Sequence, residues 1–527
     1  MSSSNPATVT GSSALFRVEM RDDVALAVLD MPGRTMNVFS WALMDELEAL
    51  IENVERNASI EALVITSGKD SFLAGAALEM VRGFTQAGRA ATREHLHQMC
   101  GRLGRMFLRL EGLQKPCVAA VNGLALGGGL ELAMACHYRV VADDPRLLLG
   151  LPEIKLGLLP GAGGTQRLPR LIGFEKGMEL LLSGRSVGPE QARSLGLMDE
   201  IAPRARLLQH AITAARKLTT KPTGSRLAPR LDQGSFDFKA PDAVRRITRH
   251  FGIADDVVAK YPAYVAIVRS TIEGANLTIA EGTGVEMDRF VDLMRDDVAG
   301  NMVVSLFLER QKADKLVQNL FGFASPRYAV PGPGKASGNL LAALGFAKAV
   351  TIDAASATKD DILILAEGEA TAETITLVED GGSTIRHGVG VFVRRSRDYG
   401  TAIEIIAPRK ASELVDKTLA LARQLRATPY LHQGTKSLLA TLTDIEARGA
   451  ASGVAADTVM VAQALAAQKL MNDEDIGDAA AGDVACVVSG AFPAYTGGPF
   501  TFLSRHDHNA IATLRAKHQR RAPFLFA

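Results

Sequence analysis

Residues 121–164 constrain the fold of this chain more than any other stretch, because they hold two glycine clusters, two carboxylates and two apolar runs. An apolar run at 118–121 leads to three consecutive glycines at 127–129 and then to 130–135, which has good helix propensity. This order predicts a strand, a tight turn and the start of a helix. Free N–H groups at such a helix start would stabilise a negative oxygen. A glycine turn that only packs the helix against the strand is an equal alternative.

Two glutamates in this stretch are the candidate acid and base. Glu131 falls in the first turn of the predicted helix among apolar residues, and poor hydration raises the pKa of such a carboxyl group. Glu153 precedes the glycine-rich segment 159–164 in a similarly apolar neighbourhood. Taken singly, each could be a helix-terminal charge or a loop carboxylate bonded to backbone. Together with the glycines, the pair favours general acid/base chemistry in a dry pocket.

Three segments carry a resemblance to a known family. They read SFLAGAALEM (71–80), NGLALGGGLELAMACHYRV (122–140) and LGLPEIKLGLLPGAGGTQRLPRLIG (149–173). They resemble the crotonase (enoyl-CoA hydratase/isomerase) superfamily. They are most similar to the hydratase half of the bifunctional fatty-acid oxidation proteins, which fuse a hydratase to a 3-hydroxyacyl-CoA dehydrogenase.

The resemblance implies roles for individual residues. The N–H groups of Ala76 and Gly128 would form an oxyanion hole for a thioester carbonyl, and Glu131 and Glu153 would handle water and proton. The resemblance also implies a set of substrate-binding residues, namely Ala74, Ala77, Leu78, Pro160 and Gly161. Ala77 stands where many members of the family carry Asp, which affects the pocket rim rather than a catalytic residue. No metal is expected.

Composition limits the partners and the compartment. The chain has 527 residues and 47% hydrophobic content, enough for about three or four domains. A net charge of +1 argues against a nucleic-acid partner. The cysteines have no disulfide or zinc spacing and are expected to be buried free thiols: Cys100, Cys117, Cys136 and Cys486. The chain shows neither a signal peptide nor a membrane-spanning run, so we expect a cytoplasmic protein.

The chain in order predicts an α/β protein with several parts. We expect a disordered tail (1–13), a crotonase-like ββα spiral domain (14–205), a helical extension with a linker helix (206–320), a reduced Rossmann-like domain (321–410) and a helical domain like the dehydrogenase C-terminal domain (411–527). Within the first domain, strands are predicted at 15–20, 24–29, 62–66, 115–121 and 200–202, and a helix at 41–54 is capped by Ser40. Further on, helices are predicted at 261–275 and 279–318.

A dinucleotide-binding loop is only weakly indicated. A strand at 328–330, a helix at 339–346 and a strand at 349–353 outline a βαβ start. The residues that would contact a dinucleotide are Gly332, Gly334, Gly338 and Asp353. The third glycine comes one position late and Pro333 lies inside the loop, so NAD binding is not expected.

The dehydrogenase chemistry is predicted to be lost. Later strands are expected near 361–365, 390–393 and 402–408, and a helix at 412–425. Where the dehydrogenase family carries a His-Phe-Phe-Asn-Pro motif, residues 391–396 read VFVRRS. The nearby His387 and His432 are out of register. The segment 490–500 resembles a motif of the dehydrogenase C-terminal domain.

The sequence therefore predicts a single-activity enoyl-CoA hydratase that converts a 2-enoyl-CoA to a 3-hydroxyacyl-CoA in fatty-acid or related acyl-CoA degradation, with no cofactor beyond the CoA of the substrate. The alternatives within the family are a Δ3,Δ2-enoyl-CoA isomerase, a hydrolase or a retro-aldol enzyme. A scaffold subunit that docks a thiolase or a separate dehydrogenase is an alternative of another class. A homo-oligomer is also possible, and the length of the acyl chain is left open.

Overall fold

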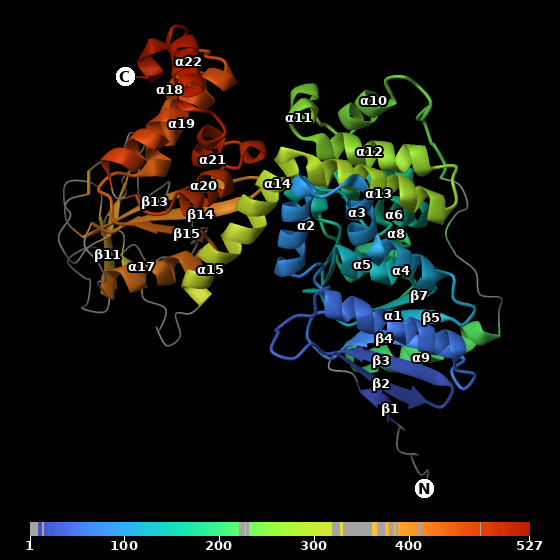
Figure 1. Cartoon of the computed structure of the whole chain (residues 1–527). Coiled ribbons are helices and arrows are strands. Elements are labelled where there is room, and N and C mark those ends of the chain that lie inside the picture. The colour runs from blue at the N-terminus through green and yellow to red at the C-terminus, as the bar shows by residue number, and fades with distance from the viewer. Residues whose placement is uncertain are drawn as a thin grey trace. The chain divides into compact units, whose positions relative to one another are not determined.

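A computed structural model describes two compact units, which divide the chain between Gly300 and Asn301 (Figure 1). The residues that it describes are 9–12, 15–220, 227, 231–318, 327–329, 361–365, 375–378, 384–385, 388–408, 413–474 and 476–526. None of the helices in these ranges combines the length and the apolar character that crossing a bilayer requires. The finer division into five parts stays a prediction.

The first unit is built on a seven-stranded sheet in the order β1-β2-β3-β4-β5-β7-β9. The strands are β1 (Val9–Ser12), β2 (Phe16–Arg21), β3 (Val24–Leu29), β4 (Ala62–Ser67), β5 (Cys117–Val121), β7 (Tyr138–Asp143) and β9 (Glu200–Pro203). The first two pairings are antiparallel and the others are parallel. Every residue of β3, β4 and β5 is buried, as expected for parallel strands that are covered on both faces.

The predicted strands and caps of this unit are confirmed, with one correction. The turn between β2 and β3 places Asp22 at φ +56°, and the Ser40 hydroxyl accepts the Leu43 N–H at 3.2 Å to cap α1 (Trp41–Arg56). Residues 9–12, expected in the disordered tail, form β1 instead. The short β-branched segment Val9–Thr10 pairs along the otherwise open edge of β2.

A second, smaller sheet explains the spiral. Its strands β6 (Ala125–Leu126) and β8 (Leu149–Gly150) pair in parallel, and isolated bridges extend it from Leu73 to Ala125 and from Phe39 to Ala76. Successive turns of the chain therefore run from a long strand to a short strand and then to a helix. The coarse prediction of a crotonase-like α/β fold is confirmed.

Helices surround both sheets of the first unit. They are α1, α2 (Leu78–Ala90), α3 (Arg93–Cys100), α4 (Arg102–Glu111), α5 (Gly128–Ala135), α6 (Gly164–Ile172), α7 (Phe174–Ser183), α8 (Pro189–Leu195), α9 (Leu207–Thr219), α10 (Ala243–His250), α11 (Asp255–Lys260), α12 (Pro262–Gly274) and α13 (Ile279–Arg295), with 3-10 turns η1 (Glu153–Leu156) and η2 (Arg204–Arg206). The α12–α13 pair packs against α6 (Figure 1). This places the helical extension beside the start of α6.

The predicted single helix over 279–318 is wrong. The helix α13 ends at Arg295, and Asp296 is extended, with φ −86° and ψ 137°. Its carboxylate accepts the Val298 N–H at 2.7 Å, which is the bond of an N-cap residue. A new helix, α14 (Asp297–Val303), therefore starts here and continues through a π-helical turn (Val304–Glu309) to α15 (Arg310–Gln318).

The second unit contains a six-stranded sheet in the order β10 to β15. The strands are β10 (Arg327–Ala329), β11 (Asp361–Leu365), β12 (Ile375–Leu377), β13 (Val389–Ser396), β14 (Gly400–Ile406) and β15 (Thr428–His432). All pairings are parallel except that of β13 with β14. The strands predicted near 328, 361, 390 and 402 are confirmed. Outside the described residues lie the predicted 339–346 helix, the 349–353 strand, His387 and the dinucleotide candidates Gly332, Gly334, Gly338 and Asp353.

Helices complete the second unit. They are α17 (Glu413–Gln424), which matches the predicted 412–425 helix, α18 (Leu438–Ala451), α19 (Ala456–Asp473), α20 (Ala479–Val488), α21 (Pro499–Ser504) and α22 (His508–Gln519). The four cysteines of the whole chain are buried free thiols, as predicted.

A buried Glu–His pair joins the sheet of the second unit to a helix. The side chains of Glu404 on β14 and His432 on β15 are both 0% exposed, with 2.9 Å between Oε1 and Nε2. The Glu404 carboxylate also accepts the Ser437 hydroxyl at 2.5 Å and the N–H groups of Leu438 and Leu439 at 2.7 and 3.0 Å. Because the Gly434 N–H donates to Nδ1 of His432, Nε2 is the ring nitrogen that donates to Glu404. The pair anchors the first turn of α18.

Replacing Glu404 with Ala should lower the free energy of unfolding of the second unit by about 3 kcal/mol, because it strands several buried donors. Trp41, the single tryptophan, lies in the first unit, so its fluorescence reports that unit alone. In urea, part of the far-ultraviolet dichroism should be lost earlier while the Trp41 transition is unchanged. Asp473→Ala, at an exposed end of α19, is the matched control. Coincident dichroism curves for wild type and Glu404→Ala would contradict the anchoring role.

Candidate active site

The start of α5 brings three segments of the chain together. Gly127 precedes the helix with φ +53°, a conformation that favours glycine. A Cβ at this position would lie 2.7 Å from Oε1 of Glu153 and 3.8 Å from Cα of Gly75. The glycine is therefore required both by its backbone angle and by the carboxyl group beside it. It places Glu153, the Gly75 segment and the first turn of α5 around one point.

Two backbone N–H groups in these segments have no internal acceptor in the described backbone. In the parallel bridge between Phe39 and Ala76, the bonds are made by the flanking groups: the Phe39 N–H donates to the Gly75 carbonyl, and the Ala77 N–H to the Phe39 carbonyl, both at 2.7 Å. The N–H of Ala76 therefore points away from Phe39. Within the described backbone, neither Ala76 nor Gly128 donates an intramolecular hydrogen bond. Two donors are thus left for an outside acceptor.

Glu131 is a buried carboxylate with fixed partners. It is 2% exposed, and its Oε1 accepts the N–H groups of Ala162 and Gly164, each at 2.8 Å. Burial raises the pKa of Glu131 to about 6, although the two N–H groups and the charge of Arg167 oppose this shift. The group is therefore ionised at neutral pH and titrates in a useful range.

Glu153 differs from Glu131 in its hydrogen bonds and in its preferred protonation state. It begins η1, and within the described part of the chain its buried Oε2 has no hydrogen-bond partner. Burial raises the pKa of Glu153 well above its usual value, and the nearby charges of Glu131 and Glu286 add to the shift. A neutral carboxylic acid is the form that this environment favours. The two predicted carboxyl groups are thus brought together with different preferred protonation states.

The structure adds a third carboxyl group that sequence reasoning missed. Glu286 on α13 is 0% exposed and accepts the N–H groups of Gly163 and Thr165 at 2.5 and 2.8 Å and the Thr165 hydroxyl at 2.5 Å. In the sequence it is one acid in an amphipathic helix, more than 120 positions from its partners. The only available signal was its place among the apolar positions of α13 that face inward.

The remaining predicted substrate residues flank the same site. Ala74 and Ala77 lie on the segment of Ala76, where the Ala74 N–H donates to the Asn37 carbonyl at 2.9 Å, and Leu78 begins α2. On the other side, Pro160 and Gly161 lie on the loop whose next residues bind Glu131, and Gly161 lies against the ring of Phe290. Their contact with a substrate stays a prediction.

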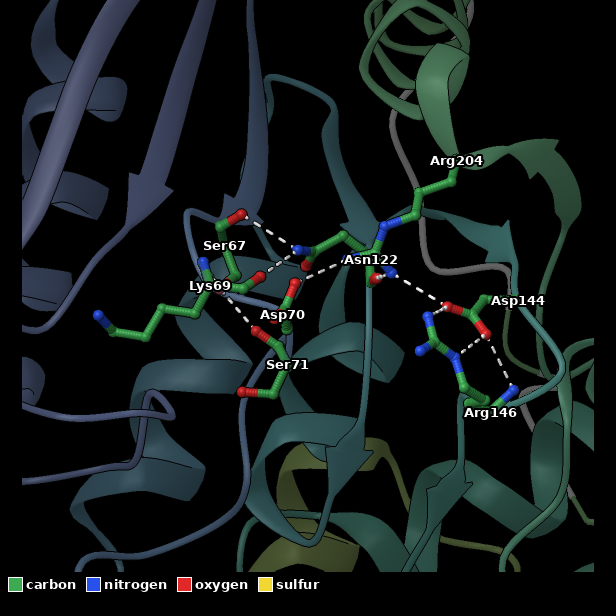
Figure 2. Close-up of polar contacts among 8 residues, drawn as sticks. All are labelled: Ser67, Lys69, Asp70, Ser71, Asn122, Asp144, Arg146 and Arg204. Carbon is green, nitrogen blue, oxygen red and sulfur yellow. Dashed lines mark hydrogen bonds and ion pairs between the residues drawn. The ribbon is translucent and has the colours of Figure 1, made fainter. Parts of the chain in front are cut away.

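A polar network holds the loops that lead to the two free N–H groups (Figure 2). The Asn122 amide, directly after β5, donates to the carbonyls of Ser67 and Lys69 after β4, at 3.2 and 2.6 Å. Arg204, after β9, donates to the Asn122 carbonyl at 3.1 Å and to Asp144 after β7 at 3.2 Å. The carboxyl ends of four neighbouring strands are therefore tied together. This network fixes the loops from which the Ala76 and Gly128 segments start.

No group of three or more histidine, cysteine or acidic side chains is placed to hold a metal ion in the part of the chain that the structure describes. Of the three glutamates, Glu131 and Glu286 are bound by N–H groups rather than by cations. The site as described therefore offers carboxyl groups and free N–H donors as its functional groups.

Residues 20–228 match the enoyl-CoA hydratase/isomerase family. The fatty acid oxidation complex subunit alpha of Shewanella amazonensis is 40% identical over 288 residues, which is 52% of this chain and 38% of that protein. The same subunit of Shewanella halifaxensis is 38% identical over 299 residues, or 54% and 40% of the two chains. The matches thus span about two fifths of the length of these relatives.

Solved structures are also similar to this chain. Pseudomonas aeruginosa DspI is 31% identical, with 42% of this chain and 85% of DspI covered and a TM-score of 0.36. The enoyl-CoA hydratase from Bacillus halodurans is 23% identical, with 55% and 98% covered and a TM-score of 0.40. Residues 20–228 of this chain therefore form a domain of the crotonase (enoyl-CoA hydratase/isomerase) superfamily.

Proposed function

We propose that the protein is an enoyl-CoA hydratase that adds water to a 2-enoyl-CoA and releases a 3-hydroxyacyl-CoA. The observation that carries the proposal is a pair of carboxyl groups with different preferred protonation states beside two N–H groups without internal partners. Relatives named as fatty acid oxidation complex subunits support a place in fatty-acid or related acyl-CoA degradation.

The mechanism assigns one task to each group. The N–H groups of Ala76 and Gly128 bind the thioester carbonyl and stabilise the enolate, at about 3 kcal/mol per donor. The Glu131 carboxylate takes a proton from water as the water oxygen bonds to C3. The Glu153 carboxylic acid then gives its proton to C2, and exchange with solvent restores both groups. A water-poor site strengthens each of these electrostatic interactions.

Isomerisation of a 3-enoyl-CoA is the nearest alternative, since a single base that moves one proton can perform it. A second carboxyl group that burial keeps neutral, with an oxygen free of partners in the described structure, is more useful for hydration. We therefore prefer the hydratase over the isomerase, the hydrolase and the retro-aldol enzyme.

We infer that the dehydrogenase activity of the fused proteins is lost. Residues 391–393 on β13 read Val-Phe-Val, which gives no side chain able to take a hydroxyl proton. His432, a nearby histidine, is 0% exposed and donates to Glu404. A requirement for NAD is therefore not proposed, and docking of a thiolase or a dehydrogenase and a homo-oligomer stay predictions.

Glu131→Gln and Glu153→Gln should each lower the rate of crotonyl-CoA hydration by about 10²- to 10⁴-fold, because each removes one proton-transfer group. The fold should survive, since the glutamine oxygen at position 131 can still accept the N–H groups of Ala162 and Gly164. Loss of the enoyl absorbance measures the rate. Glu190→Gln, at an exposed position of α8, is the control. Hydration at the wild-type rate in both active-site variants would exclude the proposal.

The acid side of the pH profile should report Glu131. Because its pKa is about 6 and the ionised form acts as the base, kcat/KM should reach a plateau above that pH and fall again only where Glu153 loses its proton. Below the pKa of Glu131, kcat/KM should fall about tenfold per pH unit. Initial rates with crotonyl-CoA at fixed ionic strength measure this profile. A profile that stays flat down to the ordinary pKa of glutamate would remove Glu131 from the role of base.

A 3-hydroxyacyl-CoA incubated with NAD⁺ and the protein should give no NADH, because β13 supplies no proton acceptor. The same preparation must hydrate crotonyl-CoA, which shows that it is folded and active. NADH absorbance provides the measurement, and turnover of NAD⁺ that depends on the protein would contradict the inferred loss.

A further inference from the structure

Two carboxyl groups share the N-terminus of one helix. The N–H groups of residues 162–165 precede or begin α6, where a helix has no internal partners for them. Glu131 accepts the first and third of these N–H groups, and Glu286 accepts the second and fourth. The two acids come from α5 and α13. Because each acid binds two of four consecutive N–H groups, a shift of either acid would disturb the loop that holds the other.

The loop between them has little freedom to adjust. Gly163 has φ +100°, and a Cβ there would lie 1.8 Å from the guanidinium of Arg167. The Thr165 hydroxyl lies 2.5 Å from Glu286 and 2.7 Å from the Ser270 hydroxyl of α12. The extension helices α12 and α13 therefore hold the loop from the side opposite to Glu131.

Few cations compensate this cluster of acids. The charge of Arg167 of α6 acts on Glu131, but Arg167 already pairs with Glu111 of α4 at 3.0 Å. On α13 itself, Asp288 and Asp292 are engaged by Arg93 of α3. His97 of α3 also pairs with Asp288 at 3.0 Å. The charge that acts on Glu286 from the site is that of Glu131.

The three glutamates should lose their protons in a fixed order. Burial raises the pKa of Glu131 to about 6 and that of Glu286 to about 8, and the charge of Glu131 adds to the second shift. Burial and the charges of both other acids raise the pKa of Glu153 well above its usual value. Glu131 therefore ionises before Glu286. Glu153 should keep its proton longest, because N–H groups stabilise the ionised forms of Glu131 and Glu286, whereas Oε2 of Glu153 has no partner in the described structure.

We propose that Glu286 is a positioning residue for the two catalytic carboxyl groups: it holds the loop that fixes Glu131, and its negative charge at alkaline pH keeps Glu153 in the acid form. The proposal rests on the hydratase function proposed above. It assigns to the helical extension, which lies outside the matched residues 20–228, a part in the reaction. Glu286 itself touches neither water nor substrate in this scheme.

The test compares pH profiles of kcat/KM for crotonyl-CoA. In Glu286→Gln this position stays neutral at alkaline pH, so Glu153 should lose its proton at a lower pH. The alkaline limb of the profile, where Glu153 loses its proton and the rate falls, should therefore move down by about one pH unit. The acid limb, which reports Glu131, should stay where it is. Glu286→Asp keeps a carboxyl group that can ionise. Its alkaline limb should therefore stay near the wild-type position, even if the shorter side chain lowers kcat.

Glu281→Gln is the matched control, because it makes the same change on the exposed N-terminal turn of α13 and keeps the capping box with Thr278. Its profile should match the wild type. A Glu286→Gln variant with a lower rate at every pH but an unmoved alkaline limb would show a purely structural role and overturn the proposal. Thermal melting of each variant separates loss of fold from loss of charge.

A second readout separates this proposal from the proposed function. Infrared difference spectra of the substrate-free protein follow the carbonyl stretch of protonated carboxyl groups, with Glu153→Gln identifying the band of Glu153. In Glu286→Gln this band should disappear at a lower pH than in the wild type. If the band shifts while the wild type does not hydrate crotonyl-CoA, the hydratase function fails alone. If the wild type hydrates crotonyl-CoA and the band does not shift, the role of Glu286 fails alone.

Discussion

The first unit depends on how buried carboxyl groups are stabilised at the start of α6. Burying an ionised carboxylate is costly unless hydrogen bonds replace water, and the N-terminus of a helix supplies N–H donors and a favourable dipole together. Glu131 and Glu286 use those donors alternately. The arrangement lowers the cost enough for Glu131 to ionise near pH 6, while Glu153, whose Oε2 has no partner in the described structure, remains an acid.

Much of the first unit could be predicted because its signals are local. The strands β3, β4 and β5 are continuous apolar runs, and Ser40 caps α1 directly after the bridge at Phe39. Gly127 and Gly128 mark a turn into a helix that the sequence alone indicates. The pair Glu131 and Glu153 was placed in one apolar cavity for the same reason, since both occur within one glycine-rich stretch.

Two of the features that escaped prediction depend on contacts between distant residues, and a third is a local helix cap. Glu286 meets residues more than 120 positions earlier, and its own helix offers no signal beyond its place among the inward-facing apolar positions. The break after Arg295 was missed because the propensity of 279–318 is helical throughout, whereas Asp296 ends the helix by capping the next one. The sequence puts His432 out of register with the histidine motif of the dehydrogenase family. The structure gives it a buried partner across the sheet in Glu404.

Two structural carboxylates differ from Glu153 in whether both of their oxygens accept hydrogen bonds. Both oxygens of Glu404 are bonded at the start of α18, and both oxygens of Asp483 are bonded to Phe500 and Thr501 at the start of α21. Neither of these two carboxylates has an oxygen without a hydrogen-bond partner. The Oε2 atom of Glu153 is also buried, yet within the described residues it has no partner, although an unmade bond there costs stability. A fold that tolerates this cost beside two free N–H groups keeps one acid available for a ligand, which is the physical reason to place proton donation at Glu153.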